Sequence, residues 1–298
     1  MKLAYIVLVH TAPDQAVRLI RTLDAPDTEF FVHVDAAAPA SVYDTVGRAL
    51  SGRNNVHFLR RFASGWGQFG IVAAGLHGIA RILESRARPD FTFLVSGQDY
   101  PIKRRRDVER ALASGKSFVQ AFSMPAAKWA GNGGMDRLHY WHFPWRGRFL
   151  AFPKRDLFAN PVLKLLWNAA TRLHPAKREL PTGLVFHGGE HWWCLNHACL
   201  EYLHAYAARN EATMLFFRRA LLPDEIVYQS VLLSSPLADQ IERRTLTHTD
   251  WIDGKRYPNW LTCVDIDRLR PVEHVLARKF SLEVDPAVLD LVDRELLS

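Results

Sequence analysis

The sequence predicts an α/β fold built around a mostly parallel sheet. Through the first 122 residues, short apolar runs alternate with amphipathic stretches, which is the pattern of consecutive βαβ units. Such connections are right-handed, and their ligands bind at the carboxyl ends of the strands. The 298 residues contain no internal repeat, low-complexity tract or flexible linker, so we expect one continuous domain over residues 1–298.

Five runs are predicted as strands because each is short, apolar and bounded by turn or charged residues. They are Leu3–Val9, Phe30–Val34, Val56–Leu59, Phe91–Val95 and Phe118–Phe122. Helices fit between them over Asp14–Leu23 and Gly70–Leu83, where apolar side chains recur at helical spacing. In the first helix these are Val17, Ile20 and Leu23, and in the second Val72, Leu76, Ile79 and Leu83.

The pattern loosens from Pro125 to about Gly189, where Trp, His, Arg, Gly and Pro are frequent. Asn160-Pro161 predicts one helix start there, because Asn caps well and Pro suits the first helical position. We expect an insertion or acceptor-binding region. Regularity returns with a strand at His191–Leu195, a helix at Ala198–Ala208 and a helix that opens near Pro223.

Composition excludes several protein classes. With 48% hydrophobic and 23% charged residues, the chain is neither disordered nor fibrous. Its net charge of +7 favours an anionic partner, namely a phosphate-bearing small molecule, nucleic acid or an acidic membrane face. No apolar run is long enough to cross a membrane, and the opening residues lack a signal-peptide cleavage site. Three cysteines without CxxC spacing favour a reducing compartment.

Three motif matches are weak. His187-Gly188-Gly189-Glu190-His191 has the order of an inverted zinc-protease motif, but two glycines disfavour the helix that such a site requires. Ser114-Gly115-Lys116-Ser117 ends like a P-loop, yet Arg110 replaces a required glycine. Asp265-Ile266-Asp267 is formally a metal-binding DxD pair, but it lies near the C-terminus instead of after an early strand of the sheet. We expect a solvated pair there.

Carboxylates at predicted strand ends are stronger candidates for function. Asp99 follows the strand Phe91–Val95 through a polar turn, and Asp35 directly follows Phe30–Val34. An α/β sheet places its ligand-binding groups there. Glu225 lies in the first turn of the helix near Pro223. It either serves the helix dipole or removes a proton from an incoming hydroxyl.

Seven short motifs run in order along most of the chain. They are Ile6-Val7-Leu8-Val9-His10, His33-Val34-Asp35, Gly65-Trp66-Gly67, Ser96-Gly97-Gln98-Asp99-Tyr100-Pro101-Ile102, Gly189-Glu190-His191-Trp192, Pro223-Asp224-Glu225 and Ala277-Arg278-Lys279-Phe280. Together they resemble the branching β-glycosyltransferases, which include core-2/I-branching N-acetylglucosaminyltransferases and peptide-O-xylosyltransferases. The Ser-Gly-Gln-Asp-Tyr-Pro and Pro-Asp-Glu blocks are the most specific.

The resemblance implies a GT-A fold, with a nucleotide-sugar-binding half at residues 1–122 and an acceptor and catalytic half at residues 123–298. It implies inverting transfer from a UDP-sugar, with GlcNAc favoured, and Glu225 as the catalytic base. N-acetylglucosaminyl members lack a metal-binding DxD and neutralise the leaving diphosphate with an arginine and a lysine. Here these correspond to Arg256 and Lys279, so we expect neither metal nor cofactor. Fixed cations of this kind replace a metal's Lewis-acid role.

Further site residues follow from the motif matches. Val9, His10 and Asp35 are expected near the uridine, and Asp99 near the ribose-diphosphate or donor sugar. On the acceptor side, Trp251 aligns with a family tryptophan that packs on the sugar, and a family tyrosine is replaced by Asp253. The other acceptor-side expectations are Arg137 and Glu190, with Tyr140, Trp141 and Trp145 as further groove-lining candidates.

Animal members of that family carry an N-terminal membrane anchor and several disulfides, which this sequence does not show. We therefore expect a bacterial relative in the cytoplasm, whose acceptor is a glycan or lipid-linked saccharide. Peripheral contact with the anionic inner membrane face would suit the positive charge. We expect no nucleic-acid partner. The alternatives are a UDP-xylose donor, a noncatalytic carbohydrate- or nucleic-acid-binding protein, and a zinc hydrolase.

Overall fold

The core of the protein is a seven-stranded sheet in the order β12-β6-β11-β4-β1-β2-β3. Its strands are β1 (Leu3–Val9), β2 (Thr28–Val34), β3 (Val56–Phe58), β4 (Phe91–Ser96), β6 (Ser117–Val119), β11 (Trp193–Asn196) and β12 (Ile241–Glu242). β11 runs antiparallel to both of its neighbours, whereas the other pairs are parallel. The mostly parallel sheet predicted from the sequence is therefore confirmed.

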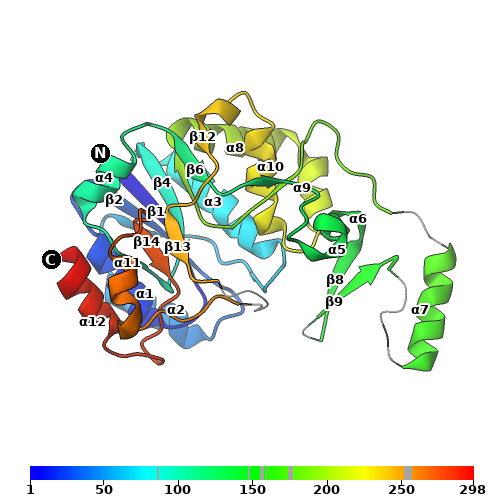
Figure 1. The fold of residues 1–298 in the computed structure, drawn as a ribbon, viewed down its shortest axis with the longest axis horizontal. Helices are drawn as coiled ribbons and strands as arrows, with labels where there is room; N and C mark the ends of the chain where they lie inside the picture. Colours follow the sequence, from blue (N-terminus) through cyan, green and yellow to red (C-terminus); the bar gives the residue numbers. More distant parts are fainter. Residues whose placement is uncertain (86, 147, 155–157, 159, 174–176, 252–256) are drawn as a thin grey trace.

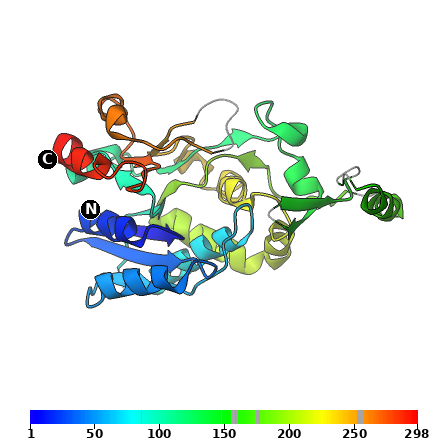
Figure 2. The same ribbon diagram turned by 90° about the horizontal axis from the view of Figure 1, so that it is seen from below.

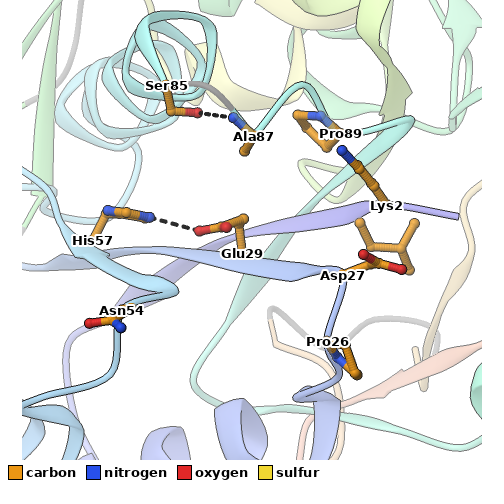
Figure 3. Close-up of a pocket in the computed structure, with 10 residues that line it drawn as sticks. Lys2, Pro26, Asp27, Glu29, Asn54, His57, Ser85, Ala87 and Pro89 are labelled. Carbon is orange, nitrogen blue, oxygen red and sulfur yellow. Dashed lines mark hydrogen bonds and ion pairs between the residues drawn. The ribbon is translucent and has the colours of Figure 1, made fainter.

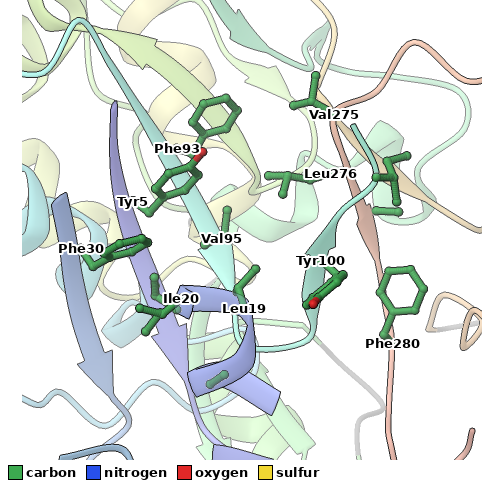
Figure 4. Packing of buried hydrophobic residues seen from close by; sticks show 14 of the residues in the cluster. Tyr5, Leu19, Ile20, Phe30, Phe93, Val95, Tyr100, Val275, Leu276 and Phe280 are labelled. Carbon is green, nitrogen blue, oxygen red and sulfur yellow. The ribbon is translucent and has the colours of Figure 1, made fainter. Parts of the chain in front are cut away.

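The structure is a computed structural model that describes residues 1–85, 87–146, 148–154, 158, 160–173, 177–251 and 257–298. All seven residues of β1 are buried because helices cover both faces of the sheet. Tyr5 of β1 lies between Phe30 of β2 and Phe93 of β4, with ring centroids 5.6 and 5.3 Å apart (Figure 4). These rings tie the three central strands together on one face.

Two helical layers enclose the sheet (Figures 1 and 2). One layer contains α1 (Pro13–Leu23), α2 (Ala40–Leu50), α4 (Arg105–Ala111), α11 (Ile266–Leu269) and α12 (Val288–Val292). The other contains α3 (Gly70–Glu84), α8 (His197–Arg209), α9 (Glu211–Phe217) and α10 (Val227–Leu233). The remaining short turns are the 3-10 helices η1 (Pro223–Glu225), η2 (Ala238–Gln240) and η3 (Cys263–Asp265), and the π-helix η4 (Asp293–Leu297).

A three-stranded sheet brings the C-terminal segment beside the end of β4. Its strands are β13 (Thr247–Thr249), β14 (Leu276–Arg278) and β5 (Asp99–Pro101), in that order. A second small sheet pairs β7 (Phe122–Ser123) with β10 (His187–Gly188), near α5 (Ala130–Gly133) and α6 (Asp136–His139). Of the predicted site residues, Asp99 lies in β5 and Lys279 directly follows β14.

A hairpin and one helix extend away from the sheet. The hairpin is β8 (Trp141–Trp145) with β9 (Arg148–Phe152), and α7 (Pro161–Leu173) lies beyond it. In both views α7 stands at the end of the molecule opposite the C-terminus (Figures 1 and 2). Asn160 accepts hydrogen bonds from the amides of Val162 and Leu163, which confirms the predicted helix start.

Two predicted elements differ from the structure. The single strand predicted over Phe118–Phe122 is wrong, because Gln120 separates β6 from β7 and its side chain accepts a hydrogen bond from the Glu190 amide. The helix predicted near Pro223 begins as the 3-10 turn η1. Ile226, with φ of −131°, interrupts it before α10 starts at Val227. α2, α4 and the β8–β9 hairpin were not predicted.

Among the described residues, no helix is both long and apolar enough to cross a bilayer. The thiols of Cys194, Cys199 and Cys263 are all free.

Candidate active site

The predicted site begins where β1, β2 and β4 end. The amide of Asp35, just after β2, donates to the carbonyl of Val9 at the end of β1 (2.8 Å). The amide of Gly97, just after β4, donates to the carbonyl of Leu8 (2.9 Å). The three strand ends are thus held side by side, as expected for the ligand-binding edge of a parallel sheet.

Asp35 organises the loops at this edge. Its carboxylate accepts hydrogen bonds from the Ser64 hydroxyl and the Ala37 amide, both at 2.7 Å. Burial opposes ionisation, but these hydrogen bonds outweigh it and lower the pKa of Asp35 below its ordinary value. The side chain is therefore an ionised acceptor that fixes residues 35–37 against residue 64.

Asp99 is a fully buried carboxylate, with 0% of its side chain exposed. It accepts hydrogen bonds from the amide and hydroxyl of Ser96 and from Nε of Arg278 (2.9 Å). The Arg278 guanidinium also lies 4.1 Å from the ring centroid of Trp192. Because Asp99 has no exposed surface in this conformation, it fixes the position of Arg278 and does not face a ligand directly.

Lys279 follows β14 directly and lies beside the strand-end turn. The next residue, Phe280, donates its amide to the carbonyl of Gln98 (2.9 Å). The Lys279 ammonium is 4.1 Å from the ring centroid of Trp260, and burial together with the charge of Arg278 lowers its pKa. This lysine is a half-buried cation on an aromatic surface.

The same cations affect the pKa of His10, which directly follows β1. Burial lowers its pKa, the charge of Asp35 opposes this, and the charges of Arg278 and Lys279 lower it further. His10, Asp35, Arg278 and Lys279 therefore share one electrostatic environment. Such a cluster suits an anion, and phosphate groups are the anions most often bound at this edge of an α/β sheet.

Glu225 lies at the end of η1 with 30% of its side chain exposed. Arg137 of α6 donates from Nη1 to its Oε2 (2.6 Å), and the guanidinium stacks on Trp129 (3.7 Å). Burial raises the pKa of Glu225, Arg137 opposes the rise, and nearby Glu190 adds to it. The result is an accessible carboxylate that is more basic than an ordinary glutamate.

The neighbouring Asp224 has a different environment. Its side chain is buried, and its Oδ2 is 3.9 Å from Nδ1 of His191, which is also buried. Burial and the charge of Glu225 raise the pKa of Asp224, and burial lowers the pKa of His191 to about 3. Only Glu225 of the two acids is accessible to a substrate hydroxyl.

Glu190 connects the two parts of the site. Its carboxylate accepts hydrogen bonds from the Thr249 hydroxyl and from Nε1 of Trp251, both at 3.0 Å. The amide of Gly189 donates to the Glu225 carbonyl (2.9 Å), which places Glu190 next to Glu225. A Cβ on Gly189 would lie 1.8 Å from the Gln120 carbonyl oxygen, so this approach requires glycine.

Trp251 is 51% exposed, and its indole is oriented by Glu190. Its exposed face suits stacking on the apolar face of a sugar. Arg256 and Asp253 lie outside the described residues. Tyr140, Trp141 and Trp145 lie in or next to β8, which belongs to the hairpin beyond α6.

The weak motif matches have structural explanations. His187 belongs to β10 and His191 to an irregular turn, so the helix that a zinc-protease motif requires is not formed. Gly115 has a φ of +73° in the turn before β6. Asp265 completes a capping box with Thr262, and Asp267 is 99% exposed. Asp267 is solvated as expected, but the expectation of a solvated pair is wrong for Asp265, because the capping box and an ion pair with Arg268 hold its side chain.

A separate pocket of about 420 Å³ lies at the opposite edge of the sheet (Figure 3). Lys2, Asp27, Glu29 and His57 line it, at the amino ends of β1 and β2 and on β3. His57 and Glu29 pair across it at 2.8 Å. Because the strand carboxyl ends point away from this pocket, we assign the candidate site to the strand-end edge instead.

A model of the core-2/I-branching enzyme family matches residues 3–271. The chain belongs to this family. Among curated proteins, it is 24% identical to xylosyltransferase 2 of Rattus norvegicus over 98% of this chain and 33% of that protein. It is 23% identical to xylosyltransferase 1 of Homo sapiens over 98% of this chain and 30% of that protein. The chain thus spans about a third of the length of these relatives.

Two solved structures show a distant likeness, each with a TM-score of 0.39. The galactosyltransferase LgtC with donor and acceptor sugar analogues is 7% identical over 94% of this chain and 87% of that one. Apo mouse xyloside xylosyltransferase 1 is 8% identical over 92% and 97%. Family membership and the observed sheet with helices on both faces confirm the predicted GT-A fold.

The structure gathers most predicted members of the family's motifs at one edge of the sheet. It also adds residues that sequence reasoning left without a role. The sequence motif includes Arg278 only as a neighbour of Lys279, although Arg278 is the cation held by Asp99. Arg137, expected on the acceptor side, is bonded to the predicted base. Thr249, which orients Glu190, has no sequence signal beyond its position before Trp251.

Proposed function

We propose that this chain is an inverting glycosyltransferase that moves a sugar from a UDP-sugar to a hydroxyl of a glycan or lipid-linked saccharide. The observation that carries the proposal is the pairing of an accessible, basic Glu225 with Arg137, beside Glu190. Membership of the core-2/I-branching enzyme family supports the same reaction class.

In the proposed step, Glu225 accepts the proton of the acceptor hydroxyl as that oxygen attacks the anomeric carbon. The bond from this carbon to the diphosphate oxygen breaks, and the electron pair leaves with UDP. Attack on the face opposite the leaving group inverts the configuration. A base with a raised pKa suits this proton transfer, which typically contributes about 10²–10⁴-fold to a rate.

Lys279 and Arg256 are proposed to stabilise the charge that develops on UDP, without a divalent metal. Arg278 has a positioning role, since Asp99 and Trp192 hold its guanidinium beside Lys279. A lysine provides a point charge, whereas an arginine provides a fork for phosphate oxygens. Val9, His10 and Asp35 are proposed to line the uridine side, and Trp251 and Glu190 the acceptor side.

The donor sugar is proposed as GlcNAc, which the resemblance of the sequence motifs to core-2/I-branching N-acetylglucosaminyltransferases favours. The xylosyltransferase relatives instead favour UDP-xylose, so both donors belong in the first test. We place the enzyme in the cytoplasm, at an anionic membrane face. The three free cysteines support a reducing compartment.

The test is a UDP-release and thermal-shift screen over UDP-GlcNAc, UDP-GalNAc, UDP-glucose, UDP-galactose and UDP-xylose, in EDTA and with manganese. We expect one donor to stabilise the protein and to release UDP slowly in EDTA. Activity that appears only with manganese would contradict metal independence while leaving sugar transfer intact. No response to any donor would contradict the proposed function and favour a noncatalytic binding protein.

A further inference from the structure

The excess positive charge of the chain comes from one segment. We call residues 141–178, which contain β8, β9 and α7, the basic arm. The basic arm holds eight Lys and Arg residues and one Asp, out of 38 basic and 31 acidic residues in the chain. The rest of the chain therefore holds 30 of each sign. The net charge of +7 arises entirely in the basic arm.

The apolar face of α7 points into solvent. Val162, Leu165, Leu166 and Leu173 have exposed fractions of 63, 69, 62 and 79%. Together with Ala169, they occupy helix positions i, i+3, i+4, i+7 and i+11, which form one continuous stripe. In a helix that packs on its own protein, such a stripe faces the core. Here it faces outward, and a large exposed apolar face of this kind marks an interaction surface.

Packing on the opposite side of α7 fixes this orientation. Trp167 donates from Nε1 to the Lys154 carbonyl (2.8 Å), and its ring contacts Phe152 and Phe158 at 5.5 Å between centroids. Thr171, one turn further, is buried. Because Trp167 and Thr171 lie opposite the stripe, the leucines cannot turn inward without breaking these contacts.

The end of the basic arm is attached to the body of the protein by Arg178. Its guanidinium bonds the carbonyls of Tyr140 and Phe216 and stacks on the Phe216 ring (3.8 Å). The other basic side chains of the arm in the described residues are exposed. They are Arg146, Arg148, Lys154, Lys164, Arg172 and Lys177.

We propose that α7 is an interfacial helix that docks the protein on an anionic lipid bilayer. Its outward stripe supplies the apolar face that enters the boundary between headgroups and acyl chains, and the surrounding cations pair with anionic headgroups. With 13 residues, α7 is too short to span the bilayer and lies in its surface. The inference extends the proposed lipid-linked acceptor class, but vesicle binding requires neither donor nor turnover.

The test is co-sedimentation of the full chain with phosphatidylcholine vesicles, with and without phosphatidylglycerol. We expect binding to the anionic vesicles that weakens as salt is raised. The double variant Leu165→Glu/Leu166→Glu should bind them roughly tenfold less tightly or worse, because two charges would enter the apolar boundary. The matched control is Val264→Glu, at an 88% exposed apolar residue outside the basic arm, which should bind like the wild type.

Substitutions of basic residues separate the electrostatic contribution to vesicle binding from the contribution of the apolar stripe. Arg172→Gln/Lys177→Gln should weaken binding to anionic vesicles and reduce its salt dependence. Arg106→Gln, in the exposed run Lys103-Arg104-Arg105-Arg106 outside the basic arm, should leave both unchanged. Circular dichroism and UDP release to water, measured on each variant, report folding and turnover separately from vesicle binding.

Failure of the wild type to bind anionic vesicles would overturn the proposal, as would equal binding by the Leu165→Glu/Leu166→Glu variant. If the wild type does not bind vesicles but is a dimer in analytical ultracentrifugation, and the variant is a monomer, the stripe would instead be assigned to contact with a second copy of the chain. If neither the wild type nor any variant released UDP while the wild type still bound anionic vesicles, the proposed function would be contradicted and the docking proposal would stand.

Discussion

The candidate site at the carboxyl ends of β1, β2 and β4, the strand-end site, differs from the basic arm in where its apolar and charged side chains lie. At the strand ends, apolar residues are buried and Asp99 pairs with Arg278 inside the protein. In the basic arm, α7 exposes its leucines, and every described Lys and Arg side chain except that of Arg178 is exposed. A site whose side chains are paired and packed within the protein has a fixed geometry. A surface that exposes both apolar and charged side chains is instead typical of contact with a partner.

The largest expected effect on stability tests the buried side of this comparison. Asp99→Asn keeps the shape of the side chain but leaves the Arg278 charge without its carboxylate. Breaking a buried ion pair in this way costs about 3–5 kcal/mol. Urea denaturation would measure the loss. Asp267→Asn, at an exposed carboxylate, serves as the control and should leave the midpoint unchanged.

The same leucine substitution in the two regions should have very different costs. Leu94→Ala in β4 removes a fully buried side chain and should destabilise the protein by about 2–5 kcal/mol. Leu166→Ala in α7 removes exposed surface and should cost less than about 0.5 kcal/mol. If the two substitutions lowered the free energy of unfolding equally in thermal or urea denaturation, the stripe on α7 would be packed in solution. The two regions would then not differ in the burial of their leucines.

Acid should weaken the sheet region through His33 of β2. Burial lowers the pKa of His33 to about 4, and its Nε2 accepts a hydrogen bond from the Phe62 amide. Since the folded pKa lies below the unfolded value of about 6.5, this contribution is complete above pH 6.5 and is lost as the pH falls toward 4. The loss amounts to roughly 3 kcal/mol. Urea denaturation across this range should show a shallower decline for His33→Gln, and identical slopes would refute the assignment.

The smallest effects come from two glycines. Gly189→Ala places a Cβ against the Gln120 carbonyl oxygen and should destabilise the protein by about 1–3 kcal/mol while displacing Glu190. Gly47→Ala in α2 meets no atom within 4 Å and should stabilise by about 0.5–1 kcal/mol. A melting temperature that falls for Gly189→Ala and rises for Gly47→Ala would support the close approach of Gly189 to Gln120. An unchanged melting temperature for Gly189→Ala would contradict it.

The sequence predicted elements where burial and periodicity agree. β1, β2 and β4 are short apolar runs between turns. Of the stripe predicted for α3, Val72 and Ile79 are buried, and Leu76 and Leu83 are partly buried against the same core. The start of α7 was also predicted, but from the capping signal of Asn160-Pro161 and not from apolar spacing. Periodicity identifies an apolar face but not what covers it, so the outward orientation of α7 required the structure.

The site was predictable in its types of residue but less so in their partners. An aspartate at a strand end has the same sequence pattern whether it binds a ligand or forms a buried pair. The partner of Asp99, Arg278, is 179 residues away in the chain. Likewise, nothing local to Glu225 indicated that Arg137 would bond it across 88 residues.

The most direct test of the account measures Glu225→Gln against the wild type, using the UDP-sugar that responds in the donor screen. We predict that UDP release falls by about 10²–10⁴-fold while the donor Kd stays close to that of the wild type. Glu211→Gln, at an exposed glutamate in α9, should change neither quantity. Turnover by Glu225→Gln at the wild-type rate, with normal donor binding, would contradict the assignment of Glu225 as the base.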